Sequence, residues 1–156
     1  MLTISEEDFL WYLNRALDEM IAILFRLGDD DVNRKPNLAG ANSPFAIVTH
    51  CLGVMEYWGG HIVRGRKSER DRDAEFRASG SVPELVERVE TARRQLRQDV
   101  LKADGLAPPS TLPEDDDRDR PLGRTQMGVL MHIYEELAWH LGHLEITRDI
   151  LLKDRT

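Results

Sequence analysis

The segment from Met131 to His143, MHIYEELAWHLGH, carries three of the chain's five histidines and two glutamates within one predicted helix. On a period of 3.6 residues, one narrow arc of that helix holds His132, Glu136, His140 and His143. Leucine and isoleucine border the arc, so burying a carboxylate and imidazoles there without a partner would be costly. A cation would remove that cost. The arc therefore predicts a metal site, against the simpler alternative of a solvated salt bridge beside a core histidine.

The length and composition predict one soluble domain covering residues 1–156. The single cysteine, Cys51, excludes an intramolecular disulfide framework and suits a reducing cytosol. The N-terminal sequence lacks the features of a signal peptide, and no apolar run is long enough to cross a bilayer. A net charge of −7 argues against a nucleic-acid partner, because phosphate binding needs clustered Lys and Arg. We therefore expect a cytoplasmic protein that binds neither membranes nor nucleic acids.

Two helices are predicted in the first half of the chain. The first begins after the N-cap Ser5 and keeps helical spacing of apolar residues until Gly28 stops it. A polar loop over residues 29–42 leads to Ser43 and Pro44, an N-cap followed by proline at the first helical position. The second helix should continue to about residue 64, weakened or kinked at Gly59-Gly60.

Two more helices are predicted after a charged link, Lys67–Arg77. A capping box at Ser81 opens a third helix that runs to about residue 103, and the final helix covers residues 124–153. The connection between them holds the acidic run Glu114–Arg120, to which we assign no role. Four amphipathic helices with almost no strand signal predict an all-α fold, a four-helix bundle with long connecting loops and one or two crossover connections.

Residue spacing limits which histidines can share one ion. His50 and His61 are about 16 Å apart along a helix axis, and His132 lies about 12 Å from His140, so neither pair can bind the same metal. His140 can pair with Glu136, four residues before it, or with His143, three residues after it, and spacing alone does not decide.

Several kinds of chemistry have no support in the sequence. It contains no Gly-rich phosphate loop, Cys-x-x-Cys pair or nucleophile elbow, and the metalloprotease motif His-Glu-x-x-His is also absent. Cys51 points about 100° away from His50 on a helix, so we interpret it as a small buried hydrophobe.

Two segments carry a family resemblance. NSPFAIVTHCLGVMEYW resembles the second helix of the DinB/YfiT-like metalloprotein bundles, and HIYEELAWHLGHLEITRDIL resembles their last helix. The likeness is strongest to the actinobacterial branch that includes mycothiol-dependent transferases and is related to the mycothiol-dependent maleylpyruvate isomerase. Glu145 and Thr147 depart from the branch pattern of Asp and Leu. Glu136 stands where many members carry a histidine, as in the Glu-x-x-x-His version of the isomerase branch.

The resemblance implies a metal triad of His50, Glu136 and His140. The other candidates are expected to support these ligands or to line a substrate pocket: His143, His132, His61, Tyr57 and Arg148. Dimers are common in the family, so the resemblance also allows a homodimer.

Three protein ligands with open positions are typical of a catalytic divalent metal. Zinc suits this set best, although nickel, iron and manganese accept it too. The main hypothesis is a thiol S-transferase in which the metal activates a low-molecular-weight thiol such as mycothiol for attack on an electrophilic substrate. The alternatives are a hydrolase that uses a metal-bound water and a non-catalytic bundle that binds a metal or ligand.

Overall fold

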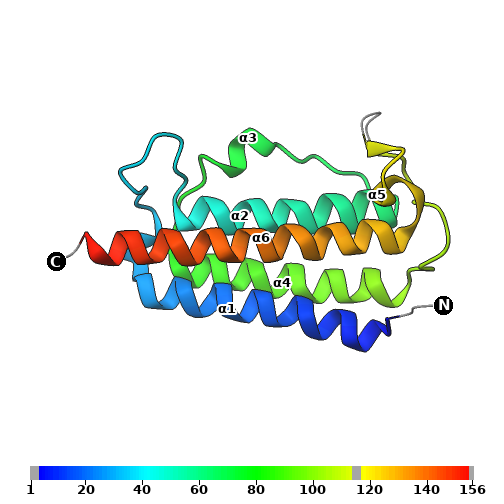
Figure 1. Cartoon of the computed structure of the whole chain (residues 1–156), viewed down its shortest axis with the longest axis horizontal. Coiled ribbons are helices and arrows are strands. Elements are labelled where there is room, and N and C mark those ends of the chain that lie inside the picture. The colour runs from blue at the N-terminus through cyan, green and yellow to red at the C-terminus, as the bar shows by residue number, and fades with distance from the viewer. Residues whose placement is uncertain (1–3, 114–116, 155–156) are drawn as a thin grey trace.

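Four long helices dominate the computed structural model, which describes residues 4–113 and 117–154 (Figure 1). They are α1 (Glu6–Val32), α2 (Pro44–Val54) with its π-helical continuation η1 (Met55–Val63), α4 (Val82–Leu101) and α6 (Gln126–Lys153). The connections contain two short helices, α3 (Arg72–Glu75) and α5 (Pro121–Arg124). No strand occurs within the described ranges. The predicted all-α helical bundle is confirmed.

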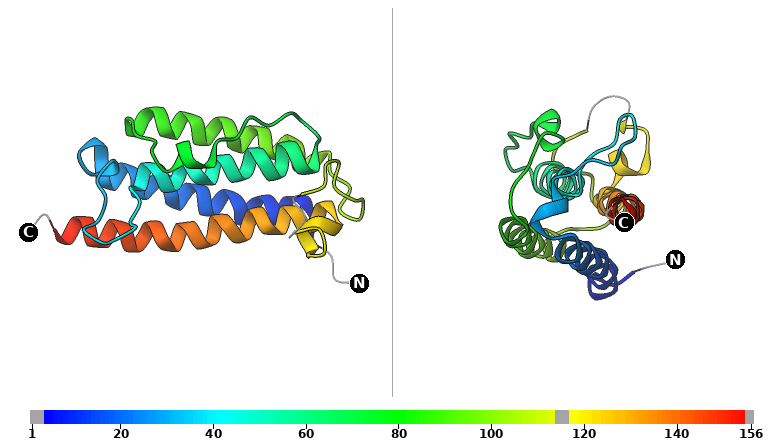
Figure 2. Two further views of the ribbon diagram at one scale, coloured as in Figure 1. Left: turned by 90° about the horizontal axis from the view of Figure 1, so that it is seen from above. Right: turned by 90° about the vertical axis from the view of Figure 1, so that its left-hand side faces the viewer.

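The long helices run side by side, as the end-on view in Figure 2 shows. Their buried apolar side chains form one core. Helix α1 packs against α4 and α6, and α2 with η1 packs against the same two helices. Each helix contributes side chains that are almost completely buried, among them Leu17, Leu24, Ile47, Leu85 and Leu137. Because α6 lies directly against α2, polar residues on their facing sides can meet at the edge of this core.

The predicted helix starts agree with the structure. The hydroxyl of Ser5 accepts a hydrogen bond from the Asp8 backbone N–H at 3.0 Å, and Ser81 forms the expected capping box with Glu84. Gly28 interrupts α1 with a φ of 67°, a conformation that glycine adopts without strain. The helical conformation therefore stops at Gly28 as predicted, and a further helical turn that was not predicted follows it to Val32.

The connections differ from the sequence-based expectation. Lys67–Arg77 was predicted to be a plain charged link, but it contains α3 and runs back along the outside of α2 (Figure 1). Among the described connections this is the one crossover, and it lets α2 and α4 point the same way (Figure 1). Helix α6 begins at Gln126 because Thr125 has an extended backbone and caps it. Of the acidic run Glu114–Arg120, residues 114–116 lie outside the described part of the chain.

None of the helices in the described ranges is both long and apolar enough to cross a bilayer.

Candidate metal centre

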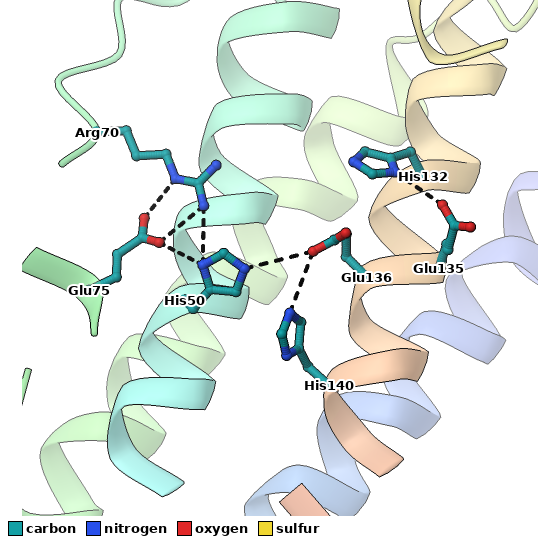
Figure 3. Close-up of polar contacts among 7 residues, drawn as sticks. All are labelled: His50, Arg70, Glu75, His132, Glu135, Glu136 and His140. Atoms are coloured by element: carbon teal, nitrogen blue, oxygen red, sulfur yellow. Dashed lines mark hydrogen bonds and ion pairs between the residues drawn. The ribbon is translucent and has the colours of Figure 1, made fainter. Parts of the chain in front are cut away.

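His50, Glu136 and His140 converge where α2 packs against α6 (Figure 3). One potential ligand atom from each residue lies within 4.8 Å of the others. Nε2 of His50 is 3.7 Å from Oε2 of Glu136, and Nε2 of His140 is 3.5 Å from the same oxygen. These three residues, called the triad below, form a group that could hold one metal ion.

The spacing within the triad fits a shared ion. Atoms that bind one tetrahedral zinc at about 2.1 Å lie about 3.4 Å from one another. The two distances to the Glu136 oxygen are near this value and longer than the usual N–H···O hydrogen bond of about 2.9 Å. Two imidazoles and a carboxylate are also the donors that catalytic zinc sites use. The triad therefore has the donor chemistry of a divalent-metal site, and the two separations that involve Glu136 have the spacing of one.

Electrostatics keep the Glu136 carboxylate charged. His140, and then His50, hold the pKa of its carboxyl group well below the usual range, and these effects exceed the opposing effect of partial burial. An ionised carboxylate is the form that binds a cation.

The second ring nitrogen of His50 faces a different carboxylate, that of Glu75 in α3 (Figure 3). Nδ1 of His50 lies 2.8 Å from Oε2 of Glu75. Arg70 binds Glu75 through Nε, at 2.6 Å from Oε1, and through a terminal nitrogen, at 3.0 Å from Oε2. The ring of Phe76 stacks on His50 with centroids 4.8 Å apart. The crossover connection thus covers the outer side of His50.

A cavity of about 500 Å³ opens beside the triad. His50 and Glu136 line it together with Tyr57, Trp58, His132, Arg70, Arg72, Val54 and Asp117. Nδ1 of His132 lies 3.1 Å from a Glu135 oxygen, and the ring meets Trp58 edge-on at 4.8 Å. A larger cavity, of about 780 Å³, lies between α2, η1 and α4 but includes no triad residue. The smaller cavity is the one that two triad residues, His50 and Glu136, line directly.

The model of the mycothiol-S-transferase (MST) family matches residues 8–152, nearly the whole chain. The chain belongs to the mycothiol-S-transferase family. The resemblance found in the sequence is therefore confirmed, and within the DinB/YfiT-like proteins the match is to the actinobacterial branch. No curated protein shows significant similarity to the chain.

The sequence analysis predicted that five further residues support the metal ligands or line a substrate pocket, and in the structure they fall into two groups. His132 and Tyr57 line the triad cavity. The other three do not line it: His143 is exposed with its ring 6.1 Å from that of His140, Arg148 binds Asp149 at 2.8 Å, and Nδ1 of His61 donates to the Arg66 carbonyl at 2.7 Å.

Cys51 is completely buried, in agreement with its interpretation as a small hydrophobe. Burial, and then the charge of Glu136, raise the pKa of its thiol far above the usual range. The thiol therefore stays protonated and is a poor nucleophile.

The sequence did not reveal Glu75 and Arg70, because a segment rich in charges with no periodicity is typical of a solvated link. The one available signal was Phe76, a lone aromatic residue in that run. An aromatic side chain there indicates packing against the bundle, and Phe76 does pack, on His50.

Proposed function

We propose that this member of the mycothiol-S-transferase family joins mycothiol through its sulfur to an electrophilic substrate, with a divalent metal held by the triad. The thiol loses its proton, an S–C bond forms, and the electrophile loses its leaving group or opens its epoxide ring or double bond. The single observation that carries the proposal is the convergence of two imidazoles and a carboxylate beside a cavity in a chain of this family. Zinc is the metal that this donor set favours.

When bound, the metal would lower the pKa of an incoming thiol, so that the attacking thiolate exists at neutral pH. His50, Glu136 and His140 would hold the metal at one end of the cavity. The cavity is large enough for a small molecule and is lined by aromatic and charged side chains. Tyr57 and Trp58 offer apolar contact area to a substrate, and Arg72 offers positive charge.

His132 is the residue we propose for handling the thiol proton. Its imidazole lines the cavity and lies outside the triad. The Glu135 carboxylate beside Nδ1 favours the tautomer with the proton on that atom, which leaves Nε2 free to accept another. A histidine so placed can take the proton that the thiol gives up as the attacking thiolate forms.

The test is turnover by the purified, metal-loaded protein with mycothiol and a panel of alkyl halides, epoxides and activated alkenes. Thioether formation should require both mycothiol and metal and should disappear in His50→Ala. Glu69→Gln, which changes an exposed carboxylate in the crossover, should behave like the wild type. Product formation without thiol would point to a hydrolase. Unchanged thiol-dependent turnover in His50→Ala would overturn the proposal.

A further inference from the structure

We propose that Glu75 is a positioning residue, which fixes the tautomer and ring orientation of His50 and thereby sets the metal affinity of the triad. This inference rests on the proposed metal site and adds to it an element that lies outside the triad. Glu75 and His50 are both buried, so water does not compete for their contact.

The contact distances favour one placement of the proton on the His50 ring. An ionised carboxylate can only accept hydrogen bonds, so we assign the donor role to Nδ1, which lies 2.8 Å from Oε2 of Glu75. A terminal nitrogen of Arg70, which only donates, is farther from Nδ1, at 3.4 Å. With the proton on Nδ1, the lone pair of Nε2 faces Glu136, where a metal would bind.

Glu75 cannot be a ligand of the same ion, because it faces the ring nitrogen that does not take part in the triad (Figure 3). It acts through His50 instead. Metal-binding histidines generally donate their second N–H to such a partner, which raises the basicity of the ligating nitrogen.

Gly53 makes the approach of Glu75 possible. It lies three residues after His50, on the same side of α2. A Cβ atom at this position would stand 1.8 Å from Oε1 of Glu75, 2.6 Å from its Cδ and 3.0 Å from Nε of Arg70. Any side chain at residue 53 would therefore push the carboxylate away from His50.

Arg70 holds the Glu75 carboxylate in the space beside Gly53. A buried carboxylate without a counter-charge would be costly, and the two bonds from Arg70 offset that cost while setting the orientation of Glu75. The Arg70 guanidinium also lies over the Tyr57 ring, 5.7 Å from its centroid, so it is fixed on a second side.

His140 lacks a comparable support. Its Nδ1 atom is buried and has no hydrogen-bond partner within the described residues. His50 is therefore the histidine of the triad whose ring is held in place before a metal binds. Removing its contact with Glu75 should weaken metal binding.

The test compares zinc affinity, measured by competition with a chelating dye, in Glu75→Ala, Gly53→Ala and the wild type. Both variants should bind about 10–100-fold more weakly, the usual loss when such a partner is removed. Glu75→Gln keeps an acceptor oxygen and should lose less. Gly142→Ala is the matched control, since its new methyl group meets nothing within 4 Å.

Nitrogen-15 NMR of the metal-free wild type gives a readout that needs no variant. The proton of neutral His50 should reside on Nδ1, and its presence on Nε2 would overturn the inference. Unchanged zinc affinity in both Glu75→Ala and Gly53→Ala would also overturn it, while the proposed metal site would stand. Absence of zinc binding by the wild type would overturn both.

Discussion

Nε2 of His50 lies 3.7 Å from Oε2 of Glu136, although the two residues are far apart in the sequence and belong to different helices. The packing of α2 against α6 creates this pairing, and neither helix could form the triad alone. A metal bound there would link the two helices, so metal binding and the stability of the bundle should be coupled.

Zinc should raise the melting temperature of the wild-type protein. With free zinc at a hundred times the dissociation constant, the added stability is about 2.7 kcal/mol, because the ion binds the folded state and not the unfolded one. Differential scanning calorimetry with and without a chelator measures this shift. His50→Ala should melt at the same temperature in both conditions, and a zinc-dependent shift in that variant would contradict the account.

Glu136 should contribute nothing to the pH dependence of metal binding near neutral pH. A carboxylate with a lowered pKa loses its charge only as pH falls through that lowered value, which for Glu136 lies well below 4.5. Between pH 5 and pH 7 Glu136 therefore releases no proton when a metal binds. Calorimetry at pH 6 in buffers of different ionisation enthalpy measures the number of protons released per metal. Glu136→Gln should not lower that number; a lower count would show that Glu136 is protonated.

His132→Gln should slow thiol transfer without removing the metal. His132 lines the cavity but is not one of the triad residues, so the variant should keep its zinc. Losing a proton acceptor typically lowers the rate by about 10²-fold or more. Steady-state kinetics together with metal analysis of the same sample make the comparison. Loss of zinc in this variant would place His132 among the ligands instead.

Two substitutions in α6 test which side of this helix faces the core. Leu137 is fully buried, so Leu137→Ala should lower the free energy of unfolding by about 2–5 kcal/mol. Trp139 is 67% exposed, and Trp139→Ala should change stability by about 0.5 kcal/mol or less. Urea unfolding measures both. A larger loss for Trp139→Ala than for Leu137→Ala would mean that the helix is rotated.

The long helices were predictable because each carries a local signal. Apolar residues recur with helical spacing, and Ser5, Ser43 and Ser81 cap the helices as expected. The π-helical conformation over Met55–Val63 was not predicted; the sequence indicated only a weakened or kinked helix there.

In the candidate site, too, some features follow from a local sequence signal and others do not. The spacing of Glu136 and His140 within one helix is a local property, whereas choosing His50 over His143 required the family resemblance. The contact between Glu75 and His50 depends on a crossover that brings α3 against α2, and no sequence pattern encodes that path. The supporting residues of the site therefore became visible only in the folded chain.

Metal content is the most direct test of the central claim that His50, Glu136 and His140 hold a divalent ion. Elemental analysis of untagged protein, after dialysis against zinc and then against metal-free buffer, should give about one ion per wild-type chain. His50→Ala and His140→Gln should retain almost none, while His143→Gln should retain as much as the wild type. Loss of the ion in His143→Gln with retention in His140→Gln, or a wild-type protein that binds no divalent metal, would contradict the account.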